Sequence, residues 1–353
     1  MIEPRKMPGS ELDKRKAYIL ATVVYEYIAT AEPVGSQTLS QKYRLGVSSA
    51  TIRNEMAELE AAGYLEQPHT SAGRIPSDAG YRTYVDELMT PETLAPDEQG
   101  RIRDEFRAAS RELDDVIEST TRLLGQLSKN LAFVVAPARD SQTFRHMQLL
   151  WLSPQTGLAL IVTSVGVAAQ NVFDFHSEVD PDALTRLSNR LNAKLGGTTL
   201  RDIAALDLAA LVRAEHLPEE VTTAVCDAFA MAASSEEPVI AAAGAQHLVD
   251  QPEFHDLRKL RSILRIIEEQ KKLYDLVADS MHTQGPLVKI GHELGSDEMT
   301  ECSVVTVPYR FGEGMVGVLA ILGPRRMPYG RLLALATGTA RSLNDHLANA
   351  EIR

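Results

Sequence analysis

The spacing of apolar residues near the start of the chain predicts three helices followed by a hairpin. Apolar side chains recur every three to four positions over 12–31, which is the period of an amphipathic helix. Proline and glycine at 33–35 interrupt that period, and two further helices are predicted at 37–43 and 49–62, each after a serine that can cap it. The pattern then predicts, in order, a strand at 64–67, a polar turn at 69–73, a return strand at 74–75 and a helix at 77–88. Helix, helix, helix and hairpin is the order of a winged helix-turn-helix.

The rest of the chain alternates between helical and strand-like patterns. A linker is expected at 91–96, and the charged, periodic stretch 97–130 is interpreted as one long helix. Further strands are predicted at 147–152, 158–164, 171–175, 238–244, 303–310 and 315–322, and further helices at 180–233, 254–281 and 330–350. Gly196-Gly197 and Pro218 divide the helical segment 180–233 into pieces. The helix at 254–281 is expected to be continuous and built around Leu257, Leu260, Leu264, Ile267 and Leu273. These elements predict a multidomain α+β chain.

Composition changes this picture little but excludes several classes of protein. Of 353 residues, 44% are hydrophobic and 24% are charged, as in ordinary folded domains. We expect no secretory signal, because the basic residues near the start are not followed by an apolar stretch, and no segment is apolar for long enough to span a bilayer. Cys226 and Cys302 suggest neither a disulfide framework nor a metal cluster, which fits a reducing cytoplasm. The net charge of −12 argues against a protein that coats nucleic acid, but it leaves room for a small DNA-reading module.

The third predicted helix carries the clearest chemical signal. Its apolar stripe is formed by Ile52, Met56 and Leu59. The residues that point away from this stripe in the first turns are Ala50, Thr51, Arg53 and Asn54. A recognition helix enters the major groove with its first turns. Arginine can make two hydrogen bonds to guanine, and asparagine two to adenine, because their planar side chains match those base edges. The pattern therefore predicts a helix that reads DNA.

Residues around this helix are candidate phosphate contacts. The helix N-terminus and the hydroxyls of Ser48, Ser49 and Thr51 can hold phosphate oxygens. The polar hairpin offers a second contact surface, with the candidate residues His69, Thr70, Ser71, Gly73 and Arg74. Tyr43 and Arg44 are further candidates for contact with the DNA backbone. The carboxylates of Glu55, Glu58 and Glu60 lie further back and would repel DNA, so only the front of the helix should enter the groove.

Two other interpretations of this segment stay open. Arg53 and Asn54 would equally be found on an ordinary surface helix, where they meet only water. Winged helices can also be protein-binding modules, and the moderate charge of the segment is compatible with that use. The combination of caps, apolar stripe, forward-placed arginine and asparagine, and polar hairpin favours DNA.

The sequence resembles the HrcA-type heat-inducible transcription repressors over essentially its whole length. The matching residues are SSATIRNEM at 48–56, Leu59-Glu60, QPHTSAGRIP at 67–76, GYR at 80–82, YVD at 84–86, QPEF at 251–254, Gly291, CSVV at 302–305 and GPRRMPY at 323–329. The N-terminal run is highly specific, whereas 180–237 matches in pattern more than in residues.

The resemblance implies three domains, and as partners it implies DNA, a second copy of the chain and a chaperonin. They are a winged helix-turn-helix DNA-binding domain at 1–90, a discontinuous GAF-like α/β domain at 91–139 and 238–353, and an inserted α+β dimerising domain at 140–237. Members of this family repress chaperone operons as homodimers on an inverted-repeat operator in double-stranded DNA. They commonly depend on the GroE chaperonin to stay active. These properties are expectations carried over from the resemblance.

Other motifs do not support a catalytic function. The sequence GEGMVG at 312–317 has the glycine spacing of a dinucleotide-binding loop, but an apolar strand follows where a helix is required, so a hairpin turn is predicted. The nine histidines show no metal-ligand spacing, and no nucleophile with its base can be placed. We therefore expect no catalytic residue, metal or cofactor. Arg325-Arg326 is interpreted as a solvated turn, with an anion site as the alternative.

Two rival functions remain beside the repressor. The first is a regulator that senses a small molecule in the GAF-like domain, because the sequence does not exclude a pocket there. The second is an interaction scaffold whose winged helix binds no DNA.

Overall fold

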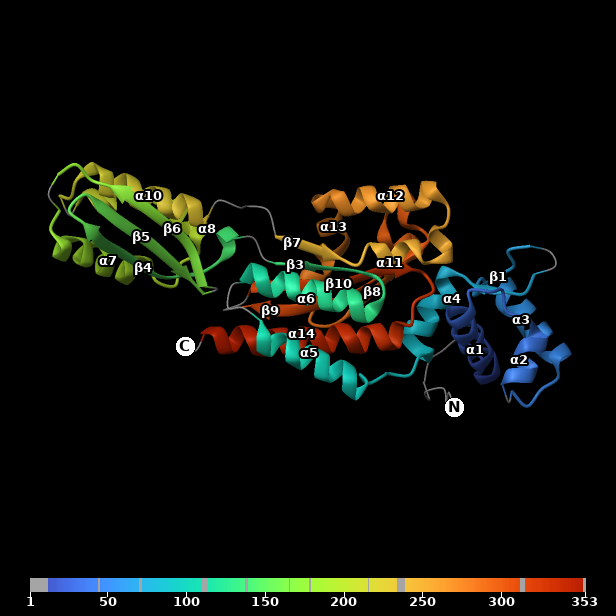
Figure 1. The fold of residues 1–353 in the computed structure, drawn as a ribbon. Coiled ribbons are helices and arrows are strands. Elements are labelled where there is room, and N and C mark those ends of the chain that lie inside the picture. The colour runs from blue at the N-terminus through green and yellow to red at the C-terminus, as the bar shows by residue number, and fades with distance from the viewer. Residues whose placement is uncertain are drawn as a thin grey trace.

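The computed structural model describes residues 12–351 except 44, 70–71, 110–112, 137–138, 165, 178, 215, 234–238 and 312–314. The arrangement is elongated (Figure 1). The N-terminal helices lie at one end, a unit with a three-stranded sheet lies at the other, and a five-stranded sheet with its helices lies between them. The predicted mixed α+β architecture is confirmed.

The N-terminal elements follow the predicted order. They are α1 (Lys14–Thr30), α2 (Ser36–Lys42), α3 (Ser49–Ala61), β1 (Leu65–Glu66), β2 (Ile75–Pro76) and α4 (Asp78–Thr83), and α4 continues into one π-helical turn, η1 (Tyr84–Leu88). Strands β1 and β2 pair antiparallel. Val34, just before α2, bridges to Arg74 through two backbone hydrogen bonds of 2.9 Å, which ties the hairpin to the start of α2. Apolar faces of α1, α2 and α3 meet in one core.

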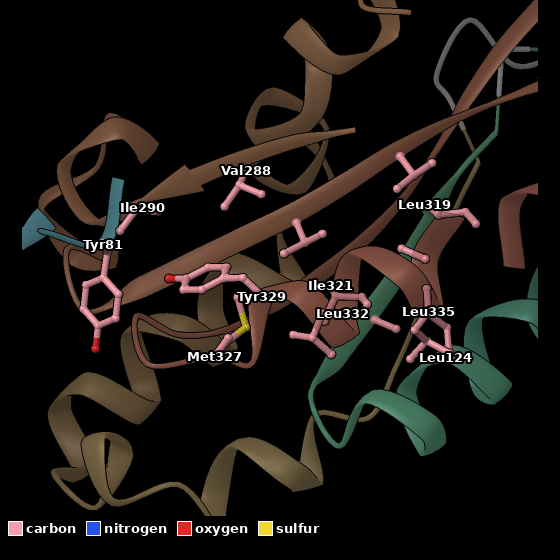
Figure 2. Close-up of a cluster of buried hydrophobic side chains, with 14 of the residues drawn as sticks. Tyr81, Leu124, Val288, Ile290, Leu319, Ile321, Met327, Tyr329, Leu332 and Leu335 are labelled. Carbon is pink, nitrogen blue, oxygen red and sulfur yellow. The ribbon is translucent and has the colours of Figure 1, made fainter. Parts of the chain in front are cut away.

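The central sheet is antiparallel and buried on both faces. Its strands are β3 (Leu131–Val135), β7 (Ile240–Ala243), β8 (Leu287–Ile290), β9 (Cys302–Phe311) and β10 (Met315–Pro324), in the spatial order β7-β3-β10-β9-β8. Alternate residues of β10 enter two different cores, with Leu319 and Ile321 on one face and Val318 on the other. Figure 2 shows the first of these cores, where Leu124, Leu332 and Leu335 meet the sheet. One face is covered by α5 (Pro96–Ala108), α6 (Leu113–Ser128) and α14 (Tyr329–Glu351), and the other by α11 (Gln246–Val249), α12 (Leu257–Glu268) and α13 (Gln270–Val277).

Two strands of this sheet, β3 and β8, were not predicted. The run at 131–135 is a short apolar stretch that follows a helix, and periodicity does not separate such a run from more helix. In contrast, β9 and β10 were predicted, and they pair antiparallel, with Met315 of the glycine-rich sequence already opposite Phe311. This is the arrangement of a hairpin, although 312–314 themselves lie outside the described residues.

Both long helices predicted from sequence are interrupted. The stretch 97–130 is divided into α5 and α6, because Ala109 has an extended backbone. The stretch 254–281 is divided at Glu269 into α12 and α13, with short 3-10 turns at Pro252–Phe254 and Ala278–His282. The predicted apolar stripe of this segment was also wrong in part. Leu257 and Leu264 face solvent, whereas Ile263 and Ile266 are buried.

The segment between β3 and β7 forms a unit with its own core. Its elements are β4 (Phe144–Ser153), β5 (Thr156–Thr163), β6 (Gly166–Asp174), α7 (Pro181–Leu195), α8 (Leu200–Ala204), α9 (Leu208–Arg213) and α10 (Glu219–Ala232). The three strands and the helix breaks at 196–197 and before α10 were predicted, whereas the break between α8 and α9 was not, and β4 and β6 begin several residues earlier than expected. The chain leaves the central sheet after β3 and returns at β7, which pairs with β3. The buried side chains of this unit are separate from the two cores of the central sheet.

The interpretation of Arg325-Arg326 as a solvated turn is wrong. The side chain of Arg325 is 19% exposed and that of Arg326 is 14% exposed, and each pairs with a carboxylate.

In the described part of the chain, none of the helices has the length and apolar composition that crossing a bilayer requires.

Candidate nucleic-acid interface

Helix α3 lies at one end of the molecule with its N-terminal turns directed outward (Figure 1). Ile52, Met56 and Leu59 are buried, as the predicted stripe requires, and Arg53 and Asn54 are exposed. The side chain of Ser48 caps the helix by accepting a 3.2 Å hydrogen bond from the Thr51 backbone N–H.

The charged residues of α3 separate into free donors at the front and paired acids behind them. Within the described residues, the side chains of Arg53 and Asn54 take part in no hydrogen bond or ion pair. Each acid, however, is paired with a cation from another element: Arg15 Nε donates to Glu55 Oε1 at 2.7 Å, Lys16 Nζ lies 2.7 Å from Glu58 Oε2, and Arg74 Nε donates to Glu60 Oε2 at 2.8 Å. The negative charge behind the front turns is therefore balanced within the fold.

The polar residues at the start of α3 bond to one another. The Ser49 hydroxyl lies 3.2 Å from that of Ser36, so the starts of α2 and α3 are linked. The hydroxyls of Ser48 and Thr51 are 3.0 Å apart. Ala50 is exposed between them. These residues form a small polar surface next to the positive end of the helix dipole.

Among the described hairpin residues, His69 has an exposed side chain, whereas Gly73 and Arg74 hold the hairpin in place. His69 is exposed at the tip, where its carbonyl accepts the Ala72 N–H at 2.8 Å. A Cβ on Gly73 would lie 2.4 Å from the carbonyl oxygen of Val34, so only glycine fits there. Arg74 is occupied by Glu60. Thr70 and Ser71, together with Arg44, lie outside the described residues.

Glu26 is a buried residue that positions neighbouring elements of the site and that sequence reasoning missed. It is buried in α1, where it accepts a hydrogen bond from the Tyr43 hydroxyl at 2.7 Å and pairs with the Lys42 ammonium. These contacts fasten the end of α2, and with it the approach to α3, onto α1. Its position seven residues after Ile19, on the apolar stripe of α1, is the signal that could have identified it.

The described residues offer little for other chemistry. No three of their His, Cys, Asp or Glu side chains gather as a metal site requires. Burial raises the pKa of the Cys302 thiol to about 12, which disfavours a reactive thiolate. A hollow of about 760 Å³ lies between 89–94, α5 and α14, on the outside of the central unit.

Comparisons with known proteins agree with one another. The family model "HrcA protein C terminal domain" matches residues 114–333. A heat-inducible transcription repressor HrcA from Pelotomaculum thermopropionicum is 38% identical over 341 residues, covering 96% of this chain and 97% of that protein. Proteins of the same name from Desulforudis audaxviator and Clostridium perfringens are 39% and 37% identical, covering 94% and 96% of this chain and 97% and 99% of those proteins. A crystal structure of a hypothetical protein, 23% identical, matches with a TM-score of 0.63 over 96% of this chain and 100% of that one, which shows a shared fold.

The contacts of Glu26 predict a specific loss of stability in acid. The hydrogen bond from Lys42 outweighs the effect of burial and, with that from Tyr43, lowers the pKa of Glu26 below its ordinary 4.5. Because the folded pKa is the lower one, Glu26 stabilises the fold fully above pH 4.5 and loses its contribution as the pH falls through the folded pKa. Glu26→Gln should cost about 1–3 kcal/mol at neutral pH and flatten the decline below pH 4.5 in urea-unfolding experiments. Glu66→Gln, at an exposed position, is the control. A Glu26→Gln protein with the wild-type acid profile would contradict the assignment.

Proposed function

This chain belongs to the HrcA family of heat-inducible transcription repressors, and we propose that it represses as a homodimer whose α3 helices read an inverted-repeat operator in chaperone promoters. Bound there, the dimer would occupy promoter DNA and block transcription. Two recognition helices on one face of the duplex should be separated by about 34–36 Å, one helical turn, or a multiple of it.

The proposal assigns the three units to separate tasks. Residues 1–90 would be a winged helix-turn-helix, 91–139 with 238–353 a GAF-like domain, and 140–237 an inserted dimerising domain. The order of three helices and a hairpin supports the first assignment. The exit of the chain after β3, its return on the adjacent strand β7 and the separate core of the segment between them support the insertion.

The observation that carries the DNA-binding proposal is the pair of free donors on the front of α3. Arg53 and Asn54 are exposed while the acids behind them are neutralised, so the front of the helix can approach a phosphate-lined groove. We assign base contacts to these two residues, with Ala50 against a base methyl group. Ser48, Ser49 and Thr51 lie where phosphate oxygens would meet the helix N-terminus. Among the hairpin candidates that the structure describes, His69 is exposed and available for a further contact.

The outer face of the three-stranded sheet is the proposed dimer surface. Leu150, Leu158 and Val172 stand opposite one another on β4, β5 and β6, and Val167 extends the apolar surface along β6. Helices α7 and α10 pack on the other face. An apolar row across three strands is costly to leave in water, and a second copy of the same row would cover it symmetrically.

Replacing Arg53 tests the recognition helix. Arg53→Ala should weaken binding to a duplex from the organism's own chaperone promoters by about 1–3 kcal/mol, because a bidentate arginine–guanine contact is lost. It should also relax the preference at one base position. Arg258→Ala removes an exposed arginine at the start of α12 and should leave the titration unchanged. An unaltered operator titration for a folded Arg53→Ala protein would rule out the assigned role.

Replacing Val172 tests the dimer surface. Its side chain is 64% exposed, so Val172→Asp should fold but place a charge in the proposed interface and yield monomers in light scattering. Val249→Asp, at a valine of the central unit that is 52% exposed, is the matched control and should stay dimeric. Retention of the dimer by both variants would move the interface elsewhere.

Heat inducibility is the regulatory part of the proposal. We infer that heating shifts the dimer to a form that releases the operator, and that the GroE chaperonin returns it to the binding form. Family membership is the support for this step. Operator occupancy should fall on heating and recover faster with chaperonin and ATP than without them. Equal occupancy before and after heating, with and without chaperonin, would contradict the scheme.

A further inference from the structure

The carboxylate of Asp78, at the start of α4, sits in a socket on the central unit. Arg325 Nη1 donates to its Oδ1 at 2.8 Å, and the His292 backbone N–H donates to its Oδ2 at 3.0 Å. His292 Nδ1 lies 2.7 Å from the same oxygen. Gly291 has φ +55°, and a Cβ there would lie 2.2 Å from the carboxylate, so the absence of a side chain leaves room for it. The socket is thus formed by residues more than 200 positions away in sequence.

Two arginines fasten the same units on either side of this socket. Arg82, one turn further along α4, donates to Glu293 Oε1 at 2.9 Å and to the Val288 carbonyl at 2.6 Å. Arg326 donates to Glu253 Oε1 at 2.6 Å, and its Nη1 donates to the Ile28 carbonyl at 3.1 Å. Ile28 lies in the last turn of α1, where carbonyls lack helical partners and a cation meets the negative end of the helix dipole.

An apolar contact fills the space between these ion pairs. Tyr81 is 1% exposed, and its ring packs edge-on against Tyr329 with the centroids 6.1 Å apart. Figure 2 shows Tyr81 beside Ile290 of β8 and close to Met327. Buried residues of the N-terminal helices and of the central sheet therefore form one continuous core. Within the described residues, however, the buried hydroxyl of Tyr81 has no hydrogen-bond partner.

We propose that these contacts, here called the joint (Asp78, Tyr81, Arg82, Arg325 and Arg326 with their partners), position α3 and thereby set the half-site spacing that the dimer accepts. Helix α1 packs against both α3 and α4, so fixing α1 and α4 on the sheet fixes the recognition helix. Domains joined by a small polar interface normally move relative to each other, whereas this interface combines a shared core with three paired arginines. The inference rests on the proposed function, since it assigns α3 to the operator.

Loosening the joint should change spacing selectivity more than half-site binding. The probes are a duplex from one of the organism's own chaperone promoters, the same duplex with five base pairs inserted between the half-sites, and one half-site alone. Half a helical turn places the half-sites on opposite faces of the DNA, so the wild-type protein should bind the inserted duplex far more weakly. In Asp78→Asn and Arg82→Gln, the affinity for the native duplex divided by that for the inserted duplex should fall about tenfold. A loosened joint weakens binding to the native spacing, because α3 is less well positioned, and it strengthens binding to the inserted spacing, because α3 can adjust to it. Half-site affinity should stay within about twofold.

A control variant and the behaviour of the wild-type protein distinguish a failure of this inference from a failure of the proposed function. Arg213→Gln breaks an exposed arginine–glutamate pair inside the segment 140–237 and should keep the wild-type ratio. If Asp78→Asn does not fold, Arg82→Gln carries the test. A wild-type protein indifferent to spacing would overturn the paired-helix function itself. Variants that keep the wild-type ratio, or that lose half-site and full-site affinity equally, would overturn the positioning role alone.

The hydroxyl of Tyr81 allows a variant that should strengthen the joint, whereas the preceding variants weaken it. Tyr81→Phe removes a buried polar group without changing the shape of the contact, so it should strengthen the joint. The temperature at which the operator is released should rise by a few degrees relative to wild type. A release temperature equal to or below that of wild type would show that the joint does not limit operator binding in this way.

Discussion

A charge that is withdrawn from water must be paired, and Arg325 and Arg326, just after β10, are paired in this way where the N-terminal helices meet the central unit. Burial alone would lower the pKa of Arg325, but Asp78 and Glu301 raise it, so the guanidinium stays charged and bound to both. Asp78 responds in the opposite sense: burial would raise its pKa, and the hydrogen bonds from Arg325 and His292 lower it. Each partner thus holds the other ionised. The placement of α4, then of α1, and finally of α3 follows from this pairing.

The same rule explains how an acidic chain could present the DNA-binding surface proposed for α3. The net charge is −12, yet the carboxylates of α3 are bound by Arg15, Lys16 and Arg74. Their field is therefore cancelled at short range, and the free guanidinium of Arg53 dominates the front of α3. Electrostatic screening at physiological salt extends over about 8 Å, so these neighbouring charges matter more for DNA approach than the distant acids of the body.

The sequence predicted those elements that local signals determine. Ser48 and Ser77 cap α3 and α4, and with the glycine after α3 and a stripe at helical spacing they define the N-terminal elements within a few residues of their observed bounds. The prediction that Ser36 caps α2 was wrong, because Ser36 is the first residue of that helix and Gly35 holds the cap position without a side-chain hydrogen bond. Three kinds of feature were missed because they depend on tertiary contacts. The division at Glu269 and the outward placement of Leu257 depend on how α12 meets the sheet. β3 looks like more helix until β10 is beside it. The carboxylates that pair with Arg325 and Arg74 are distant in sequence, so the sequence alone did not show that these arginines are paired. Arg74, for example, was predicted as a DNA contact, but its side chain is bound by Glu60.

The elongated arrangement makes the orientation of each unit matter for recognition. The three-stranded sheet and α3 lie at opposite ends of the molecule, so a small rotation between them becomes a large displacement of the recognition helix (Figure 1). The N-terminal helices are held by the joint, with its shared core and three arginines. The segment between β3 and β7 has a separate core and joins the sheet through two chain passages on adjacent strands. The joint therefore keeps α3 aligned with the central sheet, whereas the described residues of the segment between β3 and β7 share no core with that sheet.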